Sequence, residues 1–429
     1  MKKKYRIILY TSIFLLCVVA SIILVVKKSN SVYEEESKPK VVKHKSMLSM
    51  NLEQTAGSGD YKTVTQSSWP TEGYKFNAEL SRCENGSTLS WDDTKKAVIV
   101  SGNLSDKCYV YFDIYQPTLA EYIKSQYTGT QGENSIYYHN SSLENGAGDN
   151  SYRYAGANPN NFVCFGSDAS PCPIDNLYRI IGVFGENYHG ANGKQLVKLI
   201  KYDYMTTDEL GTDGDYSQTY KEWGMDSTYK GTYGDGERIG VYYWNYKATG
   251  SATNTWSTSL LNKTNLNTNF INNIGTTWAN KIATVTWKVG GNTWANIGTK
   301  TSSVAYTNEI TNPVTTNTTD NATTYSAKIG LMYVSDYGFA ASPDAWTLTM
   351  SSYNNTTATN NNWMYMGLYE WTISRSADRS YIAFGVDYDG YVYDGYVNYN
   401  GGVRASFNLE SSVSYVSGSG SMSDPIVIN

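Results

Sequence analysis

The sequence of 429 residues predicts an α+β fold, in which a larger C-terminal domain follows a small β domain and an N-terminal transmembrane helix. Residues 7–26 contain no charged side chain. Residues 369–409 consist of short apolar runs separated by glycines, which is typical of antiparallel strands and tight turns. Residues 256–274 place apolar side chains four apart, which indicates a helix. Helices among many short strands predict the α+β class.

The uncharged segment, residues 7–26, is predicted to be a membrane anchor. At about 1.5 Å per residue, a helix of this length matches a hydrocarbon core of about 30 Å. A cleaved signal peptide is the competing interpretation, with Val18 and Ala20 at the cleavage site, but cleavage there would leave an apolar stub. More basic residues precede the anchor than follow it, so residues 1–6 are predicted to be a cytoplasmic tail and the C-terminal domains extracytoplasmic. These basic residues are Lys2, Lys3, Lys4 and Arg6 before the anchor, and Lys27 and Lys28 after it.

Charge and composition narrow the class of partner. Residues 27–60 are charged and polar without an apolar period, so they are predicted to form a flexible stalk. The chain has 34 basic against 39 acidic residues, and no run of basic residues occurs outside the N-terminus. This balance excludes nucleic acid as an expected partner. The sequence does not indicate an oligomeric state.

Four cysteines in the predicted exported part indicate disulfides rather than a metal site. Their even number and their arrangement in two local pairs fit an extracytoplasmic protein. Three connectivities exist, and we favour the two shortest loops. No CxxC motif occurs and the three histidines are scattered, so zinc is not expected. The favoured pairs are Cys83 with Cys108, and Cys164 with Cys172.

Residues 61–115 are predicted to form the small β domain. Tyr74, Phe76 and Ala78 alternate with polar residues, and residues 108–115 read CYVYFDIY, a strand-like run. A region of this size needs several strands and a disulfide to be stable. We place its boundary with the next domain near Gln116.

Residues 116–429 are predicted to form the α+β domain. Two strands, at 177–184 (LYRIIGVF) and 195–203 (QLVKLIKYD), are joined by a Gly-rich turn. Residues 301–324 and 351–362 are dominated by Thr, Ser and Asn, so both are predicted to be long surface loops.

The motifs of residues 177–429 also form a recognisable pattern. It comprises LYRIIGVF and LVKLIK, a helix TWSTSLLN, the strand KIGLMYVSDYGFA, and a terminal block with EWTISR, AFGV, GGVRASFNL and DPIVI. This pattern resembles an uncharacterised family of bacterial extracytoplasmic domains within the C-type-lectin-like superfamily. Members tend to carry Arg-Pro in the terminal block, whereas here Ala405 follows Arg404.

The resemblance implies a compact scaffold that presents loops to a glycan or protein ligand. The calcium-binding triplets of the superfamily, Glu-Pro-Asn, Gln-Pro-Asp and Trp-Asn-Asp, do not occur, so calcium is not expected. Asp387, Asp389 and Asp394 cluster near turns, where aspartate is common for local reasons. The oxidase branch of the superfamily uses cysteines near the C-terminus, and this chain has none after Cys172.

Aromatic residues near the C-terminus are the candidate ligand-binding surface. An aromatic platform would stack on sugar rings or contact a partner protein, and the alternative interpretation is cross-strand packing within a sheet. No catalytic residue is predicted, because no nucleophile motif, HExxH or P-loop occurs. The platform residues are Tyr391, Tyr393, Tyr396 and Tyr399, with Trp363 and Trp371.

The sequence thus favours a single-pass, outward-facing bacterial surface protein with a role in adhesion or ligand recognition. Two alternatives stay open. A cell-envelope glycan hydrolase or modifying enzyme would need a cleft with two carboxylates about 5 to 10 Å apart, one with a raised pKa. A structural surface protein would have no dedicated pocket.

Overall fold

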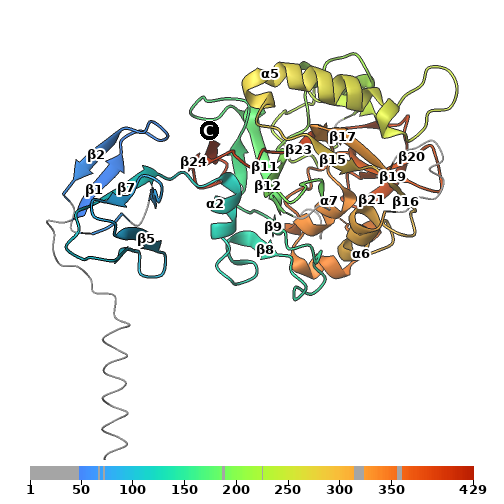
Figure 1. Cartoon of the computed structure of the whole chain (residues 1–429). Coiled ribbons are helices and arrows are strands. Elements are labelled where there is room, and N and C mark those ends of the chain that lie inside the picture. The colour runs from blue at the N-terminus through green and yellow to red at the C-terminus, as the bar shows by residue number, and fades with distance from the viewer. Residues whose placement is uncertain are drawn as a thin grey trace, which may run out of the picture. The chain divides into compact units, whose positions relative to one another are not determined.

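The computed structural model describes residues 48–65, 68–70, 73–185, 189–224, 226–313, 323–354 and 360–429. The chain divides into two compact units, residues 1–116 and residues 117–429. Figure 1 shows the first unit in blue and the second in green to red. Each unit has its own sheets and its own apolar core.

The first unit is built on a five-stranded sheet in the order β2-β1-β7-β3, with β4 also paired to β7. Strand β1 runs parallel to β7 and brings Met50 and Leu52 beside Val110 and Phe112, which form the buried core. A separate hairpin pairs β5 with β6. The bounds are β1 Leu48–Glu53, β2 Tyr61–Val64, β3 Tyr74–Phe76, β4 Arg82–Cys83, β5 Thr88–Asp92, β6 Ala97–Ser101 and β7 Cys108–Ile114.

Strand β1 lies inside the segment predicted to be a stalk. Its four C-terminal residues are buried, because they pair with β7 on one side and with β2 on the other. The ordered sheet of the first unit therefore begins earlier than the sequence suggested. The rest of the predicted stalk, up to residue 47, lies outside the described residues.

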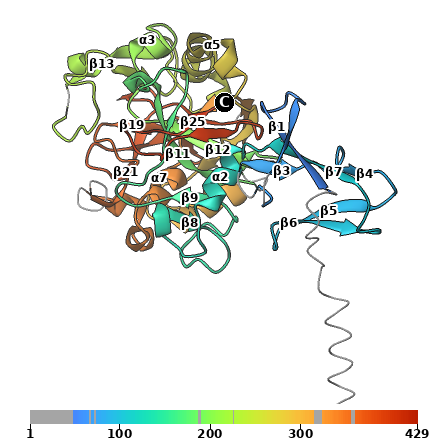
Figure 2. The ribbon, with the colours of Figure 1, turned by 90° about the vertical axis from the view of Figure 1, so that its left-hand side faces the viewer.

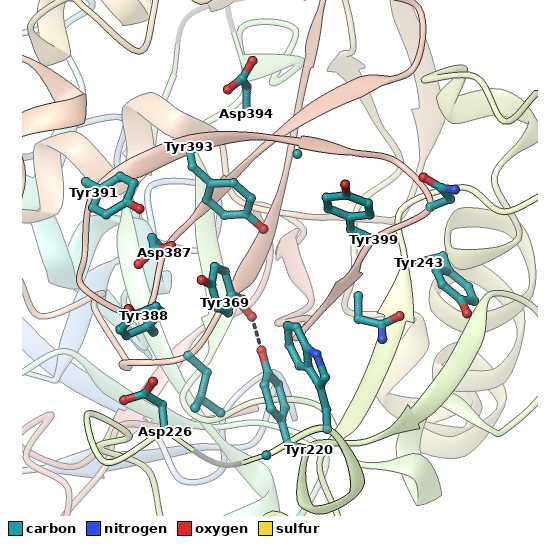
Figure 3. A pocket seen from close by; sticks show the side chains of 16 residues that line it. Tyr220, Asp226, Tyr243, Tyr369, Asp387, Tyr388, Tyr391, Tyr393, Asp394 and Tyr399 are labelled. Atoms are coloured by element: carbon teal, nitrogen blue, oxygen red, sulfur yellow. Dashed lines mark hydrogen bonds between the residues drawn. The ribbon is translucent and has the colours of Figure 1, made fainter.

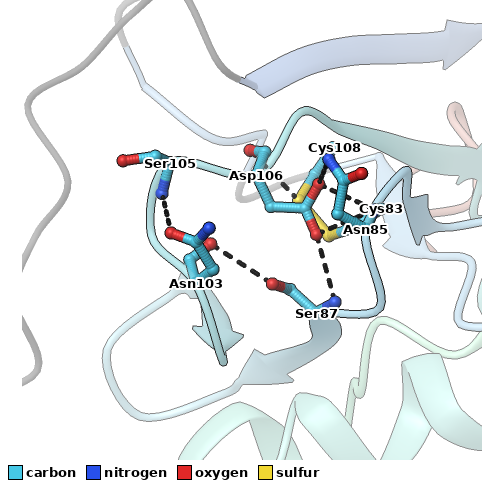
Figure 4. Close-up of a disulfide and its surroundings, with 7 residues drawn as sticks. All are labelled: Cys83, Asn85, Ser87, Asn103, Ser105, Asp106 and Cys108. Atoms are coloured by element: carbon cyan, nitrogen blue, oxygen red, sulfur yellow. Dashed lines mark hydrogen bonds between the residues drawn. A yellow bond between two sulfur atoms is a disulfide. The ribbon is translucent and has the colours of Figure 1, made fainter.

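A disulfide joins Cys83 to Cys108 and so links β4 to the start of β7. Figure 4 shows the turn beside it, where the buried Asp106 carboxylate accepts the backbone N–H groups of Asn85 and Ser87 at 2.9 to 3.1 Å. The Ser87 hydroxyl donates to the Asn103 carbonyl oxygen at 3.2 Å. The cysteine pairing favoured from the sequence is thus formed here, and the second disulfide joins Cys164 to Cys172.

The second unit is organised around a seven-stranded sheet in the order β18-β23-β12-β11-β9-β8, with β10 also paired to β11. Strands β11 and β12 form where LYRIIGVF and LVKLIK predict them, and all of their residues are buried, including Arg179, Lys198 and Lys201. Their register shifts between Ile180 and Gly182, and Gly182 is where the Tyr152 carbonyl of β9 comes closest. The bounds are β8 Ile136–Tyr138, β9 Tyr152–Tyr154, β10 Phe162–Cys164, β11 Leu177–Phe184, β12 Leu196–Lys201, β18 Ile329–Gly330 and β23 Ser406–Asn408.

Four smaller sheets complete the second unit. A four-stranded sheet has the order β16-β19-β20-β21, a three-stranded sheet the order β13-β14-β22, and β15-β17 and β24-β25 form pairs. The bounds are β13 Tyr216–Thr219, β14 Gly240–Tyr243, β15 Val285–Lys288, β16 Gly291–Asn292, β17 Thr324–Ala327, β19 Glu370–Ser376, β20 Ile382–Val386, β21 Val392–Tyr396, β22 Asn400–Gly401, β24 Tyr415–Ser417 and β25 Val427–Ile428.

Most helices of the second unit are short. The longest helical stretch among the described residues joins η5 to α5 and is interrupted by the non-helical backbone of Gly275. Helix α5 lies at the upper rim of the unit in Figures 1 and 2. The bounds are α2 Leu119–Ser125, η1 Glu133–Ser135, η2 Ile174–Asn176, α3 Thr207–Leu210, α4 Tyr220–Trp223, η4 Trp256–Thr258, η5 Leu261–Phe270, α5 Ile271–Ala279, α6 Ser302–Tyr306, η6 Thr307–Thr311, α7 Val334–Ala340, η7 Pro343–Thr347 and η8 Met350–Ser352.

The predicted α+β class with a transmembrane helix is wrong as a description of this structure. Among the residues that the structure describes, strands hold 31% and helices 20%, so this part of the chain is mainly β. The helical signal at residues 256–274 is confirmed, but the other helices are single turns or little more. The predicted anchor, residues 7–26, and the tail before it lie outside the described residues. Among the residues that are described, no helix is both long and apolar enough to cross a membrane.

Part of the predicted loop at residues 301–324 is helical. Helices α6 and η6 run from Ser302 to Thr311 and bury Ala305, Tyr306, Glu309 and Ile310. The sparse apolar residues are enough, because Ala305, Tyr306 and Ile310 lie on the buried face, while Val304 is exposed. Residues 314–322 of this loop, and residues 355–359 of the second predicted loop, lie outside the described part.

Candidate functional site

A groove of about 850 Å³ opens in the second unit where β14, α4 and the sheet of β19, β20 and β21 meet. Its lining is mostly aromatic and acidic, with no lysine or arginine (Figure 3). The lining residues are Tyr220, Trp223, Gly224, Asp226, Tyr243, Leu368, Tyr369, Asp387, Tyr388, Tyr391, Tyr393, Asp394, Gly395, Asn398, Tyr399 and Asn400.

Helix α4 places two of the rings by a capping box. The Thr219 hydroxyl accepts the N–H of Glu222, and the Glu222 carboxylate accepts the N–H of Thr219 at 2.8 Å. These bonds satisfy the free donors of the first turn and fix where the helix begins. Tyr220 is therefore held inward, where its hydroxyl donates to the Tyr369 carbonyl oxygen, and Trp223 is held at the rim, 37% exposed.

The opposite wall comes from the hairpin of β20 and β21. Gly385 pairs with Tyr393, and the Tyr393 ring lies so close to Gly385 that an added Cβ would meet the ring at 2.7 Å. Because Gly385 has no side chain, the Tyr393 ring can pack against β20 at this position. Tyr369 contacts both Tyr388 and Tyr393 edge-on, with ring centroids 5.2 and 5.6 Å apart. The wall is a connected set of rings.

Asp387 lies at the base of this wall and is 3% exposed. Burial raises the pKa of its carboxyl, although the Asp389 N–H at 2.9 Å and the Tyr369 and Tyr391 hydroxyls donate to it and oppose that shift. Burial, followed by the charge of Asp387, raises the pKa of Tyr391 to about 12. The tyrosine hydroxyls around Asp387 thus keep their protons at neutral pH and act as donors.

The two other acidic side chains of the groove have local partners. Asp226 accepts the N–H and the hydroxyl of Thr228 at 3.1 and 2.8 Å. Asp394 accepts Arg379 Nη1 at 3.5 Å, at an exposed position. The groove therefore offers fixed carboxylates, tyrosine hydroxyls and the amides Asn398 and Asn400 beside uncovered aromatic faces.

The structure divides the predicted platform. Tyr391, Tyr393 and Tyr399 line the groove, and Tyr399 is 55% exposed. Tyr396 lies outside the groove and stacks on Tyr381, with ring centroids 5.4 Å apart.

Both tryptophans of the predicted platform are buried. Trp363 donates its indole N–H to the Tyr154 carbonyl oxygen at 2.9 Å, and Trp371 donates to the Tyr242 carbonyl oxygen at 3.0 Å. Both belong to the core, and the cross-strand packing interpretation applies to Trp371, which lies in strand β19.

Sequence reasoning missed most of the groove, because only three of its 16 lining residues belong to the predicted platform. Tyr220, Trp223 and Tyr243 come from segments more than 120 residues before Tyr369, and no local pattern joins these segments. The sequence shows the glycines and aspartates near Asp387, but they indicate turns and give no sign of a groove. Among the described residues, no group of three His, Cys, Asp or Glu side chains is placed to hold a metal ion.

In comparisons with known proteins, no family model, no curated protein and no solved structure matches this chain. The similarity to the C-type-lectin-like superfamily stays a prediction from the sequence. The two disulfides are themselves informative, since such bonds persist in oxidising compartments and are typical of extracellular or periplasmic domains.

Proposed function

We propose that this protein is an exported recognition protein that binds a glycan in the tyrosine-lined groove. The observation that carries the proposal is the lining itself, in which seven tyrosines and Trp223 surround a groove of about 850 Å³. The disulfides support a location outside the cytoplasm. The sequence of residues 7–26 supports anchoring in the cell membrane.

A groove of this kind suits a sugar chain for two physical reasons. Aromatic rings present broad apolar faces that pack against the C–H faces of pyranose rings, while their hydroxyls stay available for hydrogen bonds. Ligand sites combine such apolar walls with a few fixed polar groups that set orientation, in volumes of about 300 to 1,000 Å³. Here Asp226, Asp387, Asn398 and Asn400 supply the polar groups.

Hydrolysis of the bound glycan is the second candidate function. One observation favours it, namely that a carboxyl with a raised pKa, that of Asp387, shares a groove with Asp394. Binding ranks first because Asp387 is 3% exposed and already accepts the Asp389 N–H and two tyrosine hydroxyls. A carboxyl held in this way fixes the surrounding tyrosines and has little access to a bound glycan.

Replacing Trp223 or Tyr399 by alanine should weaken glycan binding by about tenfold, because each change removes one exposed ring worth about 1 kcal/mol or more of stacking. The measurement is the dissociation constant of the purified full chain for a cell-envelope glycan selected from a panel. We expect Tyr381→Ala to leave affinity unchanged, because Tyr381 is 44% exposed yet lies outside the groove. Equal losses in all three variants, or no saturable binding to any glycan by the folded wild type, would sink the proposal. Release of shorter sugars would favour the hydrolase.

A further inference from the structure

Lys198 and Asp336 meet in the interior of the second unit, and neither residue lines the groove. Lys198 lies on β12 and Asp336 in the first turn of α7, and each is 1% exposed. Lys198 Nζ lies 2.5 Å from Asp336 Oδ2, across a sequence separation of 138 residues. Both the amine and the carboxyl are therefore held in contact with no water-exposed surface.

Both aromatic rings and other buried charged side chains, Arg153 and Glu309 among them, surround this pair. Lys198 Nζ lies 4.3 Å from the Tyr333 ring centroid and 5.2 Å from that of Trp287. Asp336 Oδ2 also accepts the Tyr333 N–H at 3.0 Å. Asp336 Oδ1 and Arg153 Nη1, 3.9 Å apart, both lack a hydrogen-bond partner among the described residues. One carboxylate oxygen is thus fully engaged and the other is left unsatisfied.

Burial makes the charged form of this pair expensive. Two ions taken out of water lose several kcal/mol of hydration free energy each. Their mutual attraction offsets this loss only when all their remaining polar atoms are hydrogen-bonded. Burial also lowers the pKa of Lys198, which favours the neutral amine that acts as a nucleophile. Burial alone would raise the pKa of Asp336, but the nearby charges of Lys198, His189 and Arg153 outweigh it and lower that pKa, so Asp336 takes up a proton only by direct transfer from Lys198. A reaction that removes both charges would relieve this cost.

We propose that Lys198 and Asp336 condense to form an intramolecular amide bond between β12 and α7. A proton passes from Lys198 Nζ to Asp336 Oδ2, which yields a neutral amine and a carboxylic acid. The amine lone pair attacks Asp336 Cγ, an N–C bond forms, and one C–O bond breaks. The departing oxygen leaves as water with two protons from the former ammonium group. The step needs no oxidant or reductant, because the ion pair already contains every atom and proton of the amide and of the water.

Two features of the site favour the product over the ion pair. Close contact between reacting groups converts a bimolecular condensation into an intramolecular one, which removes much of its entropic barrier. Hydrolysis of the bond would need a water molecule to reach a site where both side chains are only 1% exposed. The remaining amide oxygen also lies near Arg153 Nη1, the donor that lacks a partner in the ion pair.

Intact mass spectrometry of the purified full chain tests this proposal directly. The wild type should be lighter than its sequence by one water, beyond the four hydrogens lost from two disulfides. Proteolysis after reduction should yield one branched peptide that joins the segment of Lys198 to that of Asp336. A wild-type mass without this loss, or recovery of both segments as separate unmodified peptides, would overturn the proposal.

Variants assign the lost water to this pair. Lys198→Arg and Asp336→Ala should each restore the full mass, and neither should give the branched peptide. Lys221→Arg is the matched control, because Lys221 forms an exposed ion pair with Glu237, and it should keep the loss of water. If the loss persists in Lys198→Arg, it arises elsewhere in the chain and the assignment fails. The wild-type result does not depend on whether the variants fold.

Discussion

Replacing Arg404 by methionine should lower the free energy of unfolding by about 3 to 5 kcal/mol, because it leaves the Glu370 carboxylate buried without a cation. Arg404 and Glu370 are 1% and 2% exposed, and two charge-assisted bonds of 2.8 and 2.9 Å join them. Arg404 Nη2 also donates to the Met364 carbonyl oxygen at 2.6 Å, so the substitution leaves that acceptor unsatisfied as well. Urea unfolding followed by tryptophan fluorescence measures the change.

The control for this prediction is Arg238→Met. Arg238 pairs with Asp175 at 2.8 Å, but both side chains are exposed, and such a pair contributes about 0 to 1 kcal/mol. The double variant Arg404→Met with Glu370→Leu should recover most of the loss, since it removes the stranded charge. A loss at Arg404 no larger than the loss at Arg238 would show that the buried pair does not have the predicted effect.

Glu309 should make the protein more stable at pH 5 than at pH 8. Burial raises the pKa of Glu309 from 4.5 to about 7, although the N–H groups of Val334 and Ser335 donate to the carboxylate. The folded chain therefore holds a proton that the unfolded chain releases above pH 4.5. This contribution to stability is fully present below pH 4.5 and is lost as the pH rises through about 7. A shift of this size corresponds to about 3 kcal/mol.

The measurement is the free energy of unfolding of wild type and of Glu309→Gln at pH 5 and pH 8. Glutamine does not titrate, so the difference between the two pH values should be smaller in the variant by up to about 3 kcal/mol. Any constant cost of the substitution cancels in this comparison. Glu237→Gln is the control, because Glu237 is largely exposed. An unchanged pH dependence in Glu309→Gln would contradict the prediction.

The groove shows how much of a site local sequence patterns can predict. The terminal hairpin could be predicted from glycines and alternating tyrosines, and three of its tyrosines line the groove. Trp371 belongs to the same pattern, yet β19 turns it inward and buries it completely. Alternation tells which residues share a face of a strand, but it does not tell which face the next layer will cover.

The sequence by itself indicated the cysteine pairs, the mainly apolar strands β11 and β12 and the helical stretch that begins at Trp256, because each depends on short loops or on local periodicity. Only the tertiary structure decided that the chain is mainly β, that Trp223 faces the hairpin of β20 and β21, and that Lys198 meets Asp336. These contacts join segments more than a hundred residues apart. Their formation depends on the packing of whole sheets, which leaves no periodic trace in the segments themselves.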